Sequence, residues 1–101
     1  MPTTNDALEY LIEHETAVGS AKAANAGGVA CSCIEMGQNA GHTVFAAEDV
    51  YEQLHTIMKN IYKNSAAAAE KYFGNKNLLV QGGNIAGFEK VAAAMMEQGL
   101  V

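Results

Sequence analysis

The sequence predicts a mainly α-helical protein of about four helices, two of them long, with at most one short strand. Apolar residues recur at the three- to four-residue spacing of a helix along most of the 101 residues. Capping residues and glycines separate these periodic segments. Half of the residues are apolar, but alanine supplies much of that half, and each alanine buries little area. We therefore expect a single unit of long helices around a thin core, with help from neighbouring chains.

The N-terminal stretch predicts a short helix and then an extended segment. Residues 3–6, Thr-Thr-Asn-Asp, offer a threonine cap followed by an acid three residues later. Leu8, Leu11 and Ile12 continue from there as an apolar stripe at helical spacing. Residues 16–19, Thr-Ala-Val-Gly, are predicted as one short strand. A lone strand is not stable by itself, so its partners would come from absent residues or from another molecule.

Residues 25–40 predict the second helix. Asn25, Val29 and Ser32 fall on one side of it at i, i+4 and i+7. A second stripe at helical spacing consists of Val29, Cys33, Met36 and Ala40. A strand over residues 29–33 is the alternative interpretation.

Gly27 and Gly28 fall in the first turn of that predicted helix. Each glycine costs a helix about 1 kcal/mol relative to alanine. A close approach of another backbone or of a ligand would compensate for this cost. The residues alone leave both possibilities open.

Two further helices are predicted over residues 46–73 and 80–98. The first has acids early and lysines late, which suits the helix dipole. Its alanines at 66–69 would let another helix approach closely. In the last helix, Gly83 and Gly87 lie four residues apart, so a facing backbone could pack against them. Gly99 is the predicted C-cap, followed by Leu100 as its hydrophobic partner.

Composition excludes several classes of function. The net charge is −5, arginine is absent and the six lysines are scattered, which excludes a nucleic-acid surface. No apolar run approaches the roughly 20 residues of a membrane-spanning helix, so we expect no membrane partner. Cys31 and Cys33 do not form a C-x-x-C motif and indicate reduced thiols, hence a cytoplasmic location.

The sequence offers no catalytic group and no metal site. A nucleophile needs a base close by, and neither Ser32 nor the cysteines have a histidine within a helical turn. Cys31, Cys33 and Glu35 diverge around a helix, so they would not converge on a metal ion.

Three stretches of the chain resemble the C-terminal segment of hexameric glutamate dehydrogenases. They are MPTTNDALEYLIEH at residues 1–14, KAANAGGVACSCIEMGQN at 22–39 and EKYFGNKNLLVQGGNIAGFEKVAAAMMEQGLV at 70–101. The resemblance implies a piece of the C-terminal part of a Rossmann-type nucleotide-binding domain, with helices that return from it.

The resemblance also implies a function. The family converts L-glutamate to 2-oxoglutarate and ammonium with NAD or NADP, and for this chain the resemblance leans to NADP. The valine and serine of the NAGGV-x-x-S pattern, here Val29 and Ser32, would touch the substrate. Asn25 would lie by the nicotinamide.

The family's catalytic aspartate and lysines, and its glycine-rich dinucleotide turn, have no counterpart in these 101 residues. We therefore expect no catalysis and no bound cofactor for this chain alone, which would be an engineered fragment or a natural truncation. The alternative is a non-enzymatic helical module that self-associates, because a segment without its neighbours exposes apolar faces. In both cases we expect a homo-oligomer.

Overall fold

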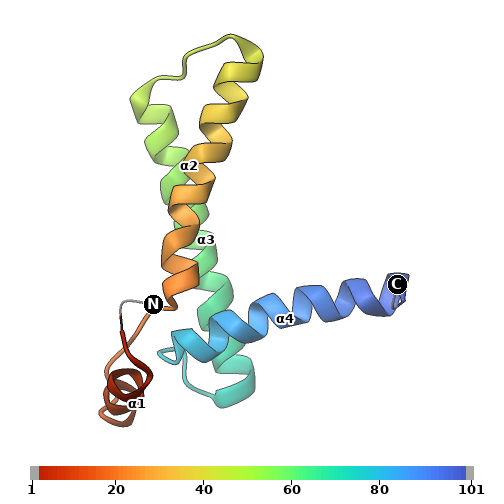
Figure 1. The fold of residues 1–101 in the computed structure, drawn as a ribbon. Helices are drawn as coiled ribbons and strands as arrows, with labels where there is room; N and C mark the ends of the chain where they lie inside the picture. Colours follow the sequence, from red (N-terminus) through yellow and green to blue (C-terminus); the bar gives the residue numbers. More distant parts are fainter. Residues whose placement is uncertain (1–2, 100–101) are drawn as a thin grey trace.

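The computed structural model describes residues 3–99, which form four helices joined by short connections (Figure 1). They are α1 (Asn5–Glu13), α2 (Ala21–Gly41), α3 (Ala47–Phe73) and α4 (Leu79–Gln98). The predicted number of helices is confirmed. Three of them, rather than two, are long, with 21, 27 and 20 residues in α2, α3 and α4.

Helix α1 begins one residue later than the sequence suggested. Thr4 rather than Thr3 is the N-cap, and its Oγ1 accepts a hydrogen bond of 3.3 Å from the Ala7 backbone N–H. The helix ends where Glu15 takes a positive φ of 56°. The Thr16 N–H then donates to the Leu11 carbonyl at 2.9 Å, which turns the chain away from the helix axis.

The predicted strand at residues 16–19 is wrong. These residues form no regular structure, and residues 3–99 contain no strand. A strand needs a partner for its backbone hydrogen bonds, and the described residues supply none. The stretch connects α1 to α2 instead.

Helix α2 is real, so the alternative strand at residues 29–33 is excluded. It begins at Ala21, four residues before the predicted start, because Ser20 acts as N-cap without a side-chain hydrogen bond. Gly27 and Gly28 consequently lie in the second turn rather than the first. At the other end His42 adopts the left-handed conformation. The Thr43 N–H donates to the Gln38 carbonyl at 3.1 Å, as in a Schellman motif.

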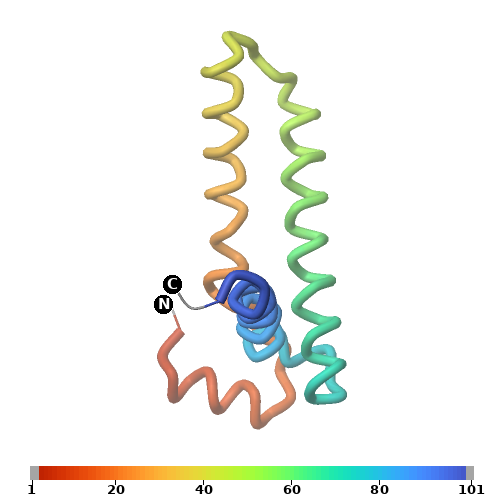
Figure 2. Tube along the Cα trace, turned by 90° about the vertical axis from the view of Figure 1, so that its right-hand side faces the viewer, coloured from red at the N-terminus to blue at the C-terminus, as the bar shows by residue number. Residues whose placement is uncertain are grey.

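Helices α2 and α3 form a long hairpin, with both helices side by side in two views (Figures 1 and 2). A hydrogen bond of 3.2 Å, which the Phe45 backbone N–H donates to Gln38 Oε1, joins the connection between the two helices to α2. Helix α3 begins at Ala47, one residue after the predicted start, and Ala46 is its N-cap. Alanine has no side-chain acceptor, so no side chain caps α3.

Helix α4 crosses the C-terminal part of α3 and then leaves it sideways (Figure 1). The predicted close approach at residues 66–69 is confirmed, because Ala68 and Ala69 are buried there. The predicted packing of a facing backbone against Gly83 and Gly87 is wrong, and a β-carbon on Gly83 would meet only side-chain atoms of Ser65 and Ser20. A β-carbon on Gly87 would meet no atom within 4 Å, whereas one on Gly82 would lie 2.1 Å from the Ser65 carbonyl oxygen.

The core is as thin as the composition predicted. The buried residues of the four helices are small: Ser65, Ala68, Ala69 and Gly82. Large apolar side chains stay exposed on every helix, and Phe88 and Met96 keep 69% and 88% of their surface. Such a core contributes little hydrophobic stabilisation.

Candidate functional site

The three predicted site residues lie together on α2. Residues 25–32 are helical throughout, so Asn25, Val29 and Ser32 share one side of the helix at i, i+4 and i+7. All three are exposed, and Val29 keeps 59% of its surface. An amide, a branched apolar group and a hydroxyl are therefore presented on one open face.

The hydroxyl of Ser32 is held by its own helix. Its Oγ donates to the Gly28 carbonyl at 3.2 Å, one turn earlier. This local bond leaves the oxygen lone pairs free to accept from a ligand. The Ser32 hydroxyl bonds a backbone carbonyl and not a base that could activate it as a nucleophile.

The two adjacent glycines of α2 have different surroundings. A β-carbon on Gly27 would lie 3.1 Å from Met58 Sδ and 3.6 Å from a methyl carbon of Leu54, so Gly27 lets α3 approach. A β-carbon on Gly28 would meet nothing within 4 Å. Gly28 precedes Ser32 by one turn, so it leaves backbone uncovered on the face of the three predicted residues.

The apolar stripe predicted on α2 does not form the helix–helix contact. Val29, Cys33, Met36 and Ala40 are all exposed. The half-buried residues of α2 lie mainly on another face, which includes Gly27 next to α3. They are Ala21, Ala23, Ala26, Gly27, Ala30, Cys31, Ile34 and Gln38. Small side chains on this face let the two helices of the hairpin approach closely.

A hollow of about 190 Å³ lies at the beginning of α2, beside α1 and α4. Its lining includes Val18, Ser20, Lys22 and Asn84. The three predicted site residues are not part of its lining, so the structure does not join them to this hollow.

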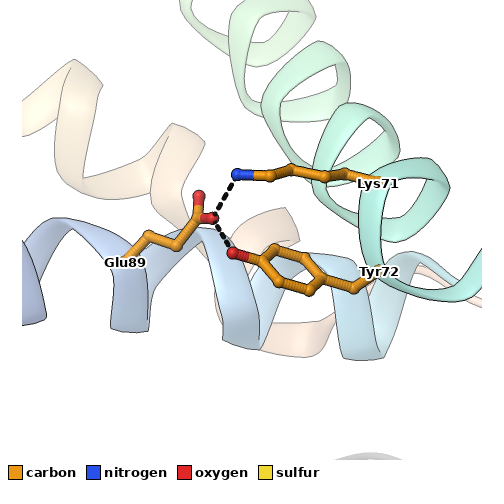
Figure 3. Close-up of polar contacts among 3 residues, drawn as sticks. All are labelled: Lys71, Tyr72 and Glu89. Atoms are coloured by element: carbon orange, nitrogen blue, oxygen red, sulfur yellow. Dashed lines mark hydrogen bonds and ion pairs between the residues drawn. The ribbon is translucent and has the colours of Figure 1, made fainter.

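A polar cluster between α3 and α4 has no signal in the sequence (Figure 3). Glu89 Oε1 accepts from Lys71 Nζ at 3.1 Å and from the Tyr72 hydroxyl. The hydrogen bond from Tyr72, and then the one from Lys71, holds the pKa of Glu89 below its ordinary value. The hydrogen bond that Lys71 donates to Glu89, followed by the contact with Tyr72, raises the pKa of Lys71 above its ordinary value. The partners lie 17 and 18 residues apart on different helices, so only the helix crossing brings them together.

Within residues 3–99, no three His, Cys, Asp or Glu side chains gather closely enough to hold a metal ion. None of the helices in this range has both the length and the apolar character needed to span a bilayer.

The sequence profile of the Glutamate/Leucine/Phenylalanine/Valine dehydrogenase family matches residues 1–99. The chain belongs to this family.

Individual members of this dehydrogenase family show the same relationship. The NAD-specific glutamate dehydrogenase of Clostridium symbiosum is 50% identical over 101 residues, which is 99% of this chain. The NADP-specific glutamate dehydrogenase of Helicobacter pylori strain J99 is 46% identical over 100 residues. A solved glutamate dehydrogenase superposes on the whole chain with a TM-score of 0.87 and 49% identity. The resemblance found in the sequence is thus confirmed.

The chain spans 22% of the length of each of these relatives. The arrangement of its helices is therefore that of one part of a glutamate dehydrogenase. The relatives include NAD-specific and NADP-specific enzymes, so similarity alone does not choose between the two cofactors.

Proposed function

We propose that this chain is the C-terminal segment of an NAD(P)-dependent glutamate dehydrogenase and supplies part of its binding site. Val29 and Ser32 would contact L-glutamate or 2-oxoglutarate, and Asn25 would contact the nicotinamide side of NADP or NAD. The observation that supports this most is the open face of α2, where Asn25, Val29 and Ser32 flank the bare backbone at Gly28.

The residues on this face fit a ligand of that kind. Val29 offers an apolar contact for the substrate's methylene carbons, and Ser32 Oγ offers a hydrogen-bond partner. Asn25 offers both a donor and an acceptor to a carboxamide. The missing β-carbon of Gly28 leaves room for a flat ring to approach the helix.

The chain's part in the reaction would be binding and orientation. When bound, the nicotinamide accepts the hydride that leaves the substrate. Asn25, Val29 and Ser32 include no general base, so the proton transfers would need other residues of the enzyme. The pure chain, incubated with glutamate and NAD or NADP, is expected to show no turnover, and a rate above background would contradict this.

The test is Ser32→Ala in a complete glutamate dehydrogenase that contains this segment. Loss of one hydrogen bond to the substrate should raise the KM for glutamate by about fivefold. Helicity should not fall, because alanine favours a helix more than serine does. Thr56→Ala is the matched control, since it also removes an exposed hydroxyl but lies on α3, outside the three-residue face. Equal KM values for the two variants would reject the assignment of Ser32.

A second function is favoured by the exposed apolar side chains. Phe88, Val91 and Met96 of α4 and Tyr62 and Phe73 of α3 are each at least about half exposed. We propose that the chain on its own forms a homo-oligomer through α3 and α4, as a helical module without enzymatic activity. Light scattering coupled to size exclusion tests this, and a well-behaved monomer would contradict it.

A further inference from the structure

The crossing of α3 and α4 combines close backbone packing at Gly82 with a polar cluster at Glu89. We propose that Glu89 is a positioning residue: with Lys71 and Tyr72 it forms a clasp that sets the direction in which α4 leaves α3, with Gly82 as the pivot. This inference concerns the geometry of the helix pair and does not depend on the proposed function.

At Gly82, α4 lies so close to α3 that there is no room for a side chain. Gly82 is buried, and a β-carbon built on it would lie 2.1 Å from the Ser65 carbonyl oxygen and 2.8 Å from Ala69 Cβ. The two backbones therefore touch at this point. Packing of two helices favours a few classes of crossing angle with a scatter of about 15–20°, so the close contact at Gly82 leaves part of the direction of α4 open.

The clasp is a second contact between α3 and α4. Glu89 follows Gly82 by seven residues, which is about two turns, or roughly 10 Å, along α4. The two side-chain hydrogen bonds that join α3 to α4 in the described part of the chain both end on Glu89 Oε1. Lys71 and Tyr72 belong to the last turn of α3, so the clasp joins the end of α3 to the middle of α4 (Figure 3).

Beyond the clasp, α4 has little that could hold its direction. Residues 93–99 are all exposed, and Met96 keeps 88% of its surface. The apolar residues next to the clasp, Phe88 and Ala92, lie with it along one shallow groove. A fixed direction of α4 therefore also fixes where this apolar face points.

The experiment measures the distance between α3 and α4 in solution. Spin labels are placed by Thr56→Cys on α3 and Ala94→Cys on α4, both exposed positions. The background carries Cys31→Ala and Cys33→Ala, which removes the two native thiols. Pulsed electron paramagnetic resonance then gives the distribution of label distances in the clasped protein and in its variants.

We expect one narrow distance peak in the background protein and its loss in Glu89→Ala, with a broad distribution in its place. Glu89→Gln keeps an acceptor for Lys71 and Tyr72, so it should recover part of the narrow peak. Glu97→Ala is the matched control, because it removes an exposed acid from α4 outside the clasp and should leave the peak unchanged.

A narrow peak retained in Glu89→Ala would overturn the proposal, and so would a broad distribution already present in the background protein. If circular dichroism shows that Glu89→Ala has lost helicity, Tyr72→Phe decides the question, since it removes a single hydroxyl. Broadening in Tyr72→Phe supports the clasp, and an unchanged peak overturns it.

Discussion

Gly82 lies against the backbone of Ser65 so closely that even a methyl group would not fit between them. A β-carbon there would stand 2.1 Å from the Ser65 carbonyl oxygen, an atom that cannot rotate away. The α3–α4 crossing thus depends on the absence of one side chain. Gly87, five residues later on the same helix, faces open space.

Gly82→Ala is expected to destabilise the chain by about 1–3 kcal/mol, because the two helices must move apart to admit the methyl group. Gly87→Ala is the matched control and should stabilise α4 by up to about 1 kcal/mol through helix propensity. Urea unfolding followed by circular dichroism measures both. Equal changes in the free energy of unfolding for the two substitutions would contradict the close contact between Gly82 and Ser65.

Gly28→Ala is expected to change stability and function in opposite directions. The new methyl group meets no atom within 4 Å, so the helix should gain about 0.5–1 kcal/mol. In a complete dehydrogenase the same methyl group would cover the bare backbone of the proposed ligand face, and the KM for glutamate should rise. Gly27→Ala is the comparison, because its methyl group would press on Met58 Sδ at 3.1 Å and should gain less stability. An unchanged KM in Gly28→Ala would mean that no ligand approaches this turn.

His42→Gly is expected to stabilise the hairpin by about 0.5–1 kcal/mol. His42 ends α2 with a φ of 50°, a conformation that costs a residue with a β-carbon more than it costs glycine. His55→Gly is the control, since His55 lies exposed inside α3 and its replacement should destabilise that helix by about 1 kcal/mol. Thermal unfolding of both variants gives the comparison. A loss of stability in His42→Gly would show that the imidazole makes a contact that outweighs its backbone strain.

The stability that the clasp contributes should depend on pH at both ends of the scale. The pKa of Glu89 lies below its ordinary value of 4.5, so its contribution is complete above that pH and is lost as the pH falls through the lowered pKa. The pKa of Lys71 lies above 10.5, so its contribution is complete below that pH and is lost as the pH rises through the raised pKa. The difference in melting temperature between the parent chain and Glu89→Ala measures this. It should be largest across the neutral range and smaller in acid and in strong base. A difference that does not change with pH would show that charge takes no part in the clasp.

The boundaries of α3 and α4 could be predicted to within one residue, since Gly74 and Gly99 mark their ends and the charges of α3 follow the helix dipole. The start of α2 could not, because Ser20 makes no side-chain cap bond and the alanines after it have no apolar period. For residues 16–19, composition alone predicts a strand. Such a stretch becomes a strand only when another strand takes up its backbone hydrogen bonds, and the pattern of a short segment does not show whether that strand is present.

In the candidate site, too, some features could be predicted from the sequence and others could not. Helical spacing was enough to place Asn25, Val29 and Ser32 on one face, because this depends only on the period of an α-helix. Which glycine meets a partner could not be predicted. Gly82 and Gly83 are neighbours, but a β-carbon on Gly82 would lie 2.1 Å from the Ser65 carbonyl oxygen, whereas one on Gly83 would lie 3.5 Å from Ser65 Oγ, an ordinary contact. Glu89 was missed for the same reason, since its partners belong to another helix.

The small size of the buried residues has a thermodynamic consequence. The heat-capacity change of unfolding follows the apolar area that becomes exposed, and Ser65, Ala68, Ala69 and Gly82 hide very little of it. The separate chain should therefore melt gradually, with a shallow calorimetric peak. The same helices, enclosed by the remainder of a dehydrogenase, should melt in one steep transition.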